Sequence, residues 1–362
     1  MRLKLFTLSF ALSMMFIEQS YAQTDKLVVA ALSQEANWNA VAPLNDKSLF
    51  ASAPRWTGSK GPQLTYIDIR GKKHAWPDQL WNSWAPGKST ENRFVNINAI
   101  RLIDSKLWVV DTGAPDFGGT PLPGGAKLVV IDVKTKNVNK TYFFDNSVAG
   151  KNSYVDDLRI NGKYAYLTDA GWAGLIVLDL ETGKSRRVLS DTPSTIASVK
   201  AIRLNDKIVL TPDGSILKVN ADPLELSPDN QWLYYGPLNG PMYRIPTWAL
   251  EDNTLDNAAL EKFVEIWFDI PPTGGTAMAK DGTFYYSDLE KNAIKRRLPN
   301  GEIETVIQDP SLHWVDAPVI DENNTLWLPV PQIDQVSLFQ NGKNLTNWPV
   351  KVFKFDLNKK IN

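Results

Sequence analysis

The sequence contains no cysteine and only two histidines, His74 and His313. The absence of cysteine excludes disulfide bonds, thiolate metal sites, cysteine nucleophiles and lipid attachment through an N-terminal cysteine. Two histidines are too few for a three-histidine zinc site or for chemistry that needs several imidazoles. A G-x-S-x-G sequence is also missing, so nothing supports a Ser-His-Asp hydrolase.

Neither sign of charge is in excess. The 39 Lys and Arg residues are balanced by 40 Asp and Glu residues, which gives a net charge of −1. Nucleic-acid-binding proteins usually carry a basic patch or stripe, so we expect no nucleic-acid partner. The basic residues form nothing longer than pairs, which we interpret as solvated surface: Lys72-Lys73, Arg186-Arg187, Arg296-Arg297 and Lys359-Lys360.

The one long apolar stretch lies at the start, in residues 5–17. It is shorter than the roughly 20 apolar residues of a spanning helix, so we expect no membrane span. Arg2 and Lys4 precede it, and Ser20-Tyr21-Ala22 follows with small residues at its first and third positions. This order is typical of a secretory signal peptide. We expect cleavage near Ala22 and a mature, monomeric protein that is secreted or periplasmic.

The remaining chain repeats a strand-rich unit whose sequence varies from copy to copy, as in LWVVD at residues 107–111 and AYLTD at 165–169. One small sheet cannot bury both of its faces, so successive copies must pack on one another, and radial packing is the propeller solution. The sequence therefore predicts an all-β fold, a single six-bladed β-propeller domain over residues 23–362. We place its units at about 38–77, 94–144, 154–189, 215–245, 274–307 and 314–357.

Two segments fall outside the regular units. Residues 246–262 are polar and helix-compatible, and we expect them to form an insert in the fourth unit, whose first strand we place at 215–219. Residues 26–32 form one strand before the first unit. We predict that this strand is the outer strand of the last blade, because such pairing closes the ring and removes a free sheet edge.

The sequence of the units resembles that of the yellow / major royal jelly protein family over nearly the whole mature chain. The matching stretches, in order, are LFASAPRW (49–56), LWVVDTG (107–113), KLVVIDVKT (127–135), AYLTD (165–169), LYYGPL (233–238) and GTAM (275–278). The resemblance implies a secreted six-bladed propeller. Some members of the family bind small aromatic amines and others are linked to dopachrome conversion. The family has no set of catalytic residues comparable to a triad, so the resemblance leaves open whether the protein is an enzyme.

Polar residues lie where the predicted inner strands begin, around the central channel. A ring of carboxylates and amides there suits a ligand ammonium group or a hard cation, although such residues also cap strand-start amides. Our candidates for ligand binding are Asn98, Asp157, Asp222 and Asp316, with Asn96 and Asp156 as near neighbours. For a tautomerase the candidate bases are Asp157 and Asp316.

Tryptophans supply the second half of the predicted site. An indole in a loop can face an aromatic or cationic ligand, although it more often packs between blades. We single out Trp56 and Trp314 as ligand-binding candidates from a set of loop tryptophans that also includes Trp38, Trp81, Trp84 and Trp172. His313, beside Trp314, lies near the same mouth but is expected to have a packing role.

A second resemblance, to calcium-dependent lactonases of the gluconolactonase type, implies a different function. Asp222 falls where those enzymes place a metal-binding Asn, but Gly274 falls at their metal-binding Asp, and their first-blade Glu aligns near Asn37 or Trp38. We therefore expect no cofactor, or at most a weakly bound calcium at Asp222. The favoured function is binding of a small aromatic or amine ligand, with dopachrome-type tautomerisation second and lactone hydrolysis third.

Overall fold

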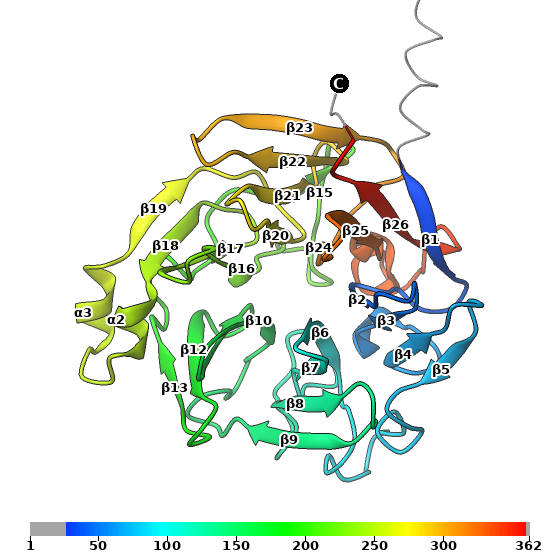
Figure 1. Ribbon diagram of the computed structural model, residues 1–362, viewed down its shortest axis with the longest axis horizontal. Helices are drawn as coiled ribbons and strands as arrows, with labels where there is room; N and C mark the ends of the chain where they lie inside the picture. Colours follow the sequence, from blue (N-terminus) through cyan, green and yellow to red (C-terminus); the bar gives the residue numbers. More distant parts are fainter. Residues whose placement is uncertain (1–26, 360–362) are drawn as a thin grey trace, which may run out of the picture.

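The structure is a computed structural model that describes residues 27–359, and it forms a ring of six four-stranded antiparallel sheets (Figure 1). The prediction of an all-β, six-bladed propeller is confirmed. The expected signal peptide, residues 1–22, lies outside the described residues. None of the helices within 27–359 has the length and apolar character needed to cross a membrane.

Each blade places one strand at the channel and three more toward the outside. The strands, blade by blade, are β2 (Ala40–Pro43), β3 (Leu49–Ser52), β4 (Leu64–Ile67) and β5 (Lys73–Ala75); β6 (Ile97–Ile103), β7 (Lys106–Asp111), β8 (Lys127–Asp132) and β9 (Val138–Phe143); β10 (Val155–Asn161), β11 (Tyr164–Asp169), β12 (Gly174–Asp179) and β13 (Ser185–Val188); β16 (Ala221–Leu226), β17 (Trp232–Pro237), β18 (Met242–Pro246) and β19 (Glu265–Phe268); β20 (Thr276–Met278), β21 (Phe284–Asp288), β22 (Ala293–Arg297) and β23 (Ile303–Gln308); and β24 (Val319–Ile320), β25 (Thr325–Val330), β26 (Val350–Asp356) and β1 (Val28–Ser33).

The last blade combines both ends of the described chain. β1 runs antiparallel to β26, with Val28 opposite Lys354 and Ser33 opposite Val350. The outer strand of the sixth sheet therefore comes from the start of the chain.

The core of the ring lies between neighbouring blades. The middle strands are buried on both faces, so their apolar residues run consecutively instead of alternating, as in β8. Leu128 and Val130 of β8, for example, belong to one buried cluster with Leu158, Leu167 and Ile176 of the next blade. Each sheet thus covers the face that its neighbour cannot bury alone.

The fourth blade differs from the prediction at one end. The helix-compatible insert is confirmed, since α2 (Thr247–Glu251) and α3 (Asn257–Glu261) lie there. The predicted strand at 215–219 is wrong, because the blade begins only at β16. That stretch makes a single bridge, between Ile216 and Leu210. Its buried Leu217 and Val219 pack in a loop cluster instead of a sheet.

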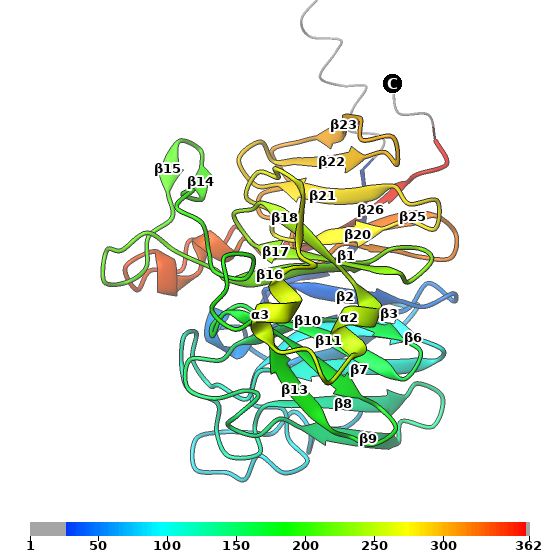
Figure 2. The same cartoon turned by 90° about the vertical axis from the view of Figure 1, so that its left-hand side faces the viewer.

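Two loop segments project from one face of the ring (Figure 2). The first covers residues 190–220 and includes a small hairpin of β14 (Arg203–Leu204) and β15 (Lys207–Ile208). The second covers residues 331–347 and includes two 3-10 turns, Ile333–Gln335 and Ser337–Phe339. Both segments contribute to one apolar cluster with Tyr154 and Trp314, so they cover this mouth of the channel.

Buried carboxylates fix the start of two inner strands. Asp111, at the end of β7, accepts hydrogen bonds from the main-chain N–H groups of Val95 (2.8 Å) and Asn96 (2.9 Å) and lies 2.8 Å from Lys127 Nζ. Asp169, at the end of β11, accepts one from the Tyr154 N–H (2.7 Å) and pairs with Arg187 at 2.9 Å. Both carboxylates thus hold the segment that leads into β6 or β10.

Replacing Asp111 with Asn should strongly destabilise the protein, because it leaves the charge of Lys127, whose side chain is 1% exposed, buried without its partner. We expect a loss of about 3–5 kcal/mol in the free energy of unfolding, measured in urea. The matched control is Glu265→Gln, which breaks the ion pair between Glu265 and Arg244. The side chain of Glu265 is 51% exposed and that of Arg244 is 34% exposed. This substitution should cost under about 1 kcal/mol. Equal effects of the two variants would contradict this role of Asp111.

Candidate functional site

Bulges at the start of three inner strands turn polar side chains into the channel. The pairing register shifts between Ile97 and Ala99 in β6, between Val155 and Leu158 in β10, and between Ala221 and Leu224 in β16. A bulge breaks the regular alternation and re-aims the side chains inside it. The bulged residues Asn98, Asp156 and Asp222 line one cavity at the channel mouth.

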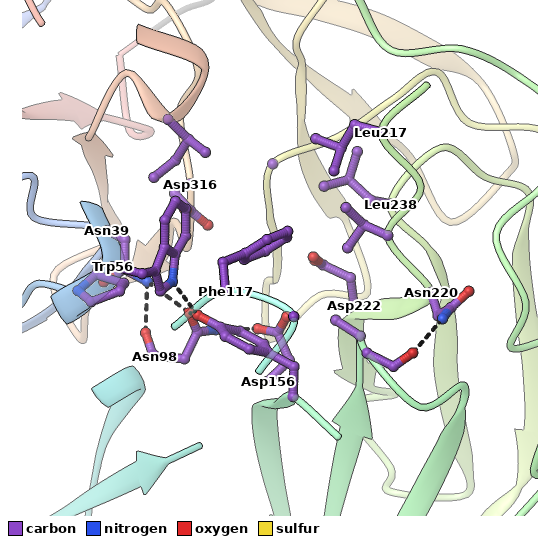
Figure 3. Close-up of a pocket in the computed structure, with 18 of the residues that line it drawn as sticks. Asn39, Trp56, Asn98, Phe117, Asp156, Leu217, Asn220, Asp222, Leu238 and Asp316 are labelled. Carbon is purple, nitrogen blue, oxygen red and sulfur yellow. Dashed lines mark hydrogen bonds between the residues drawn. The ribbon is translucent and has the colours of Figure 1, made fainter. Parts of the chain in front are cut away.

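Two more blades complete the polar ring. Asn39, just before β2, and Asp316, in the segment leading to β24, line the same cavity (Figure 3). The fifth blade offers only glycine here. A Cβ atom on Gly274 would lie 2.3 Å from the carbonyl oxygen of Val315, so close approach of the backbone excludes a side chain. Five of the six blades therefore supply an amide or a carboxyl group.

Aromatic side chains form the outer wall of the cavity. Trp56 and Phe117 have ring centroids 4.9 Å apart, and Phe117 lies 5.7 Å from Tyr154 and 5.8 Å from Phe339. Trp314 is buried beside them. The enclosed volume is about 300 Å³, at the lower end for small-molecule sites. The cavity therefore suits a small ligand with one apolar or aromatic part.

A chain of hydrogen bonds connects the aromatic wall to the carboxyl groups. The Trp56 indole donates to Tyr154 Oη at 2.8 Å, and the Tyr154 hydroxyl donates to Asn98 Oδ1 at 2.8 Å. Asn98 Nδ2 in turn donates to Asp156 Oδ1. On the other side, Asn39 Nδ2 donates to the main-chain oxygen of Asn98 at 2.7 Å. These contacts fix the side chains of the first three blades relative to one another.

The three aspartates of the cavity have raised pKa values. Burial raises the pKa of Asp222 to about 8, and the charge of Asp157 adds to the rise. Burial, followed by the charge of Asp222, raises the pKa of Asp156 and of Asp316 well above the usual range. Among residues 27–359, no ion pair involves any of the three. The cavity thus holds acidic groups that form no ion pair in the described part of the chain, and the charge of Arg101 offsets only part of the rise in the pKa of Asp316.

Asp157 belongs to a different layer of the channel. Its carboxylate binds the guanidinium groups of Arg101 and Arg159, and Arg159 Nε also donates to Glu225 at 3.0 Å. Burial alone would raise the pKa of Asp157, but the charges of Arg101 and Arg159 outweigh burial and lower it to about 2. Asp157 therefore stays ionised next to a cavity that it does not line.

The structure brings together five of the six residues that we singled out for ligand binding. Asn98, Asp222, Asp316, Trp56 and Trp314 line the cavity. The sixth, Asp157, faces the arginines, and its neighbour Asp156 takes the place in the cavity. The sequence reasoning missed several lining residues, of which the most important are Asn39, Phe117, Tyr154 and Phe339.

The other candidates have packing roles. Trp38, Trp81 and Trp84 are buried away from the cavity. Trp172 stacks on the guanidinium of Arg187, 3.8 Å from its ring centroid. His313 Nε2 lies 2.7 Å from Asp334 Oδ1 and does not line the cavity either.

The cavity is a poor match for the calcium site of the lactonases. Within the part of the chain that the structure describes, no group of three or more His, Cys, Asp or Glu side chains is placed to hold a metal ion. Gly274 supplies no side chain, neither Asn37 nor Trp38 lines the cavity, and the polar group that the first blade presents there is the amide of Asn39. Asp222 alone remains of the implied ligand set.

Comparison with known proteins identifies the family. The family model described as "Major royal jelly protein" matches residues 102–358. This chain belongs to the major royal jelly protein family. No curated protein matches the sequence.

Solved structures show the same fold at low identity. They include a streptogramin B lyase (12% identity, 91% of this chain and 96% of that chain, TM-score 0.52) and a calcium-binding protein, regucalcin, from Agrobacterium tumefaciens (12%, 91% and 90%, 0.51). A gluconolactonase from Xanthomonas campestris is also similar (13%, 91% and 89%, 0.52). At these identities the similarity establishes the fold only. The function of this protein must therefore be inferred from the residues of its own site.

The raised pKa of Asp222 predicts how stability depends on pH. The folded protein keeps a proton on Asp222 between its unfolded pKa near 3.8 and its folded pKa near 8, whereas the unfolded chain releases it. Stability from this group is therefore present below about pH 4 and is lost as the pH rises toward 8.

In Asp222→Asn, urea unfolding at pH 5 and pH 8 should show a smaller loss of stability with pH than in the parent protein. We expect a difference of at least about 1.4 kcal/mol, the equivalent of one pKa unit. Glu322→Gln, an exposed change at the other end of the inner strands, is the control. A pH dependence in Asp222→Asn that equals that of the parent would show that Asp222 ionises normally.

Proposed function

We propose that this protein is exported and binds a small aromatic amine in the cavity at the channel mouth. The observation that carries the proposal is a group of three aspartates that form no ion pair within residues 27–359, inside a small cavity with an aromatic wall: Asp156 is buried, and Asp222 and Asp316 are half-buried. An ammonium group supplies the missing positive charge, since buried carboxylates are stable only when paired. The export part depends on the leader at residues 1–22, and N-terminal sequencing of the exported protein should begin at Gln23.

The two ends of such a ligand match the two sides of the cavity. The ring would lie against Trp56, Phe117 and Phe339, which offer faces for stacking. The ammonium group would reach Asp156 and Asp222, which form no ion pair with a basic side chain in the described part of the chain. Lys218 is the one basic residue that lines the cavity in the described part of the chain, and its side chain is exposed.

Calorimetric titration with dopamine and serotonin tests the proposal. Asp156→Asn should weaken binding at least tenfold, about 1.4 kcal/mol, because it removes a carboxyl group that faces the ammonium. Glu322→Gln removes the same charge from the surface and should leave the affinity unchanged. Titration with calcium should give weak binding at most. Failure of both amines to bind, or equal affinity for the neutral 4-methylcatechol, would contradict the proposal.

A second candidate function is tautomerisation of a dopachrome-type compound. Asp156 and Asp316 favour it, because burial raises their pKa values, so each can hold a proton at a pH at which a free carboxyl group has lost it and can pass that proton to a substrate. Asp156 replaces Asp157 as candidate base, since the two arginines hold Asp157 outside the cavity.

Turnover of dopachrome separates the two functions. If the protein is a tautomerase, Asp156→Asn or Asp316→Asn should lower kcat by about 10²-fold or more. Tight amine binding with no turnover above the uncatalysed rate would exclude this second function and leave the first.

A further inference from the structure

A hydrogen-bond chain runs behind the cavity and ends on a carboxyl group of the proposed amine site (Figure 3). The Trp56 indole donates to Tyr154 Oη at 2.8 Å, and the Tyr154 hydroxyl donates to Asn98 Oδ1 at 2.8 Å. Asn98 Nδ2 then donates to Asp156 Oδ1. The chain therefore connects a loop of the first blade to the proposed ammonium-binding group through residues of the second and third blades.

The direction of this chain is fixed at its first member. An indole N–H can only donate a hydrogen bond, so the contact between Trp56 and Tyr154 uses an oxygen lone pair of the tyrosine. The single hydroxyl proton of Tyr154 cannot point back at Trp56. Tyr154 is 5% exposed, so its proton is directed at Asn98 Oδ1 and not at bulk water.

Tyr154 in turn selects the orientation of the Asn98 amide. A hydroxyl proton needs an acceptor, so Oδ1 of Asn98 faces Tyr154 and Nδ2 faces Asp156. The reversed amide would leave the hydroxyl proton without an acceptor and would place the amide oxygen against an oxygen of Asp156. Asn39 Nδ2, 3.5 Å from Asn98 Oδ1, favours the same orientation. One oxygen of the Asp156 carboxyl group is therefore held by a donor whose orientation depends on Tyr154.

We propose that Tyr154 is a positioning residue of the amine site: through Asn98, its hydroxyl holds the Asp156 carboxyl group where an ammonium group can reach it. This role rests on the proposed function and adds a residue that determines the preference for an amine over a neutral catechol. The hydroxyl is engaged by Trp56 and Asn98, so Tyr154 acts through Asp156 and not by a polar contact of its own with the ligand.

A second role of Tyr154 has to be separated from this one. Its ring belongs to the aromatic wall, with its centroid 5.7 Å from that of Phe117. Tyr154→Phe keeps the ring and removes only the hydroxyl. Tyr142→Phe is the matched control, because Tyr142 is also buried, donates to the Leu180 carbonyl at 2.9 Å and does not line the cavity.

Calorimetric titration gives the first measurement. Tyr154→Phe should weaken dopamine binding about three- to tenfold, the effect of one hydrogen bond, and should change the affinity for the neutral 4-methylcatechol by less than about twofold. Tyr142→Phe should leave both affinities unchanged. An equal loss for dopamine and 4-methylcatechol would show that Tyr154 only shapes the cavity and would overturn the proposal, and so would an unchanged affinity for dopamine.

A double-mutant cycle identifies the residue through which Tyr154 acts. In the Asp156→Asn background, Tyr154→Phe should weaken dopamine binding by less than about twofold, because the group that Tyr154 positions is already lost. Additive losses would overturn the proposal. If Tyr154→Phe does not fold, Asn98→Ala breaks the same chain one step closer to Asp156. Additive losses of Asn98→Ala and Asp156→Asn, or no loss in Asn98→Ala, would overturn the proposal equally.

A crystal structure of ligand-free Tyr154→Phe tests the positioning without any amine. We expect the contact between Asn98 Nδ2 and Asp156 Oδ1 to be lost or lengthened beyond about 3.5 Å. An unchanged contact would overturn the positioning role and leave the proposed function intact. If the parent protein binds neither dopamine nor serotonin, the proposed function fails and the role in selectivity fails with it, while the crystal structure still decides whether Tyr154 positions Asp156.

Discussion

The site depends on the hydrogen bonds that two buried carboxylates make to the main chain. Asp111 and Asp169 end the second strands of their blades and accept from the N–H groups just before β6 and β10. These bonds anchor the chain immediately before the bulges that aim Asn98 and Asp156 at the channel. The fold and the site are therefore linked through the same few interactions, and the ion pairs with Lys127 and Arg187 make them costly to break.

The channel contains two layers of charge with opposite character. In one layer, Arg101, Arg159, Asp157 and Glu225 neutralise one another. In the adjacent layer, the carboxyl groups that line the cavity form no ion pair with any basic residue of the described chain. Asp156 and Asp157 are neighbours in the sequence, yet burial and like charges raise the pKa of the first, whereas two arginines lower the pKa of the second. This contrast is the basis of the proposed ammonium site.

Much of the fold could be predicted, because the repeated strand pattern leaves a propeller as the simple way to bury every sheet. Inner-strand positions were also predictable from polar residues at strand starts, and Asn98, Asp222 and Asp316 lie in the cavity. The choice between Asp156 and Asp157 was not predictable, since a bulge changes which side chain faces the channel. Phe339 gave no signal, because long-range loop packing places it. Asn39 lies just before β2 and therefore fits the same strand-start rule, although it was not among the candidates.

The loops over the site are held without disulfide bonds. Asn220 accepts from the Ala197 N–H at 2.9 Å and donates to the Gly171 carbonyl at 2.7 Å, and Asn239 donates to the carbonyls of Ser198 (2.9 Å) and Lys200 (2.6 Å). Between these hydrogen-bonded asparagines, the apolar cluster that includes Leu217 and Trp314 covers the channel mouth. A cysteine-free member of the major royal jelly protein family can thus enclose its cavity by side-chain amides and packing alone.

The central claim is that the polar ring at the channel mouth receives an ammonium group. A crystal structure of the protein with dopamine tests it most directly. Our account predicts the amine nitrogen within hydrogen-bond distance, about 2.7–3.2 Å, of Asp156 or Asp222, with the ring beside Trp56 and Phe117. Dopamine bound elsewhere on the propeller, or bound in the cavity with its nitrogen turned to solvent, would contradict the claim.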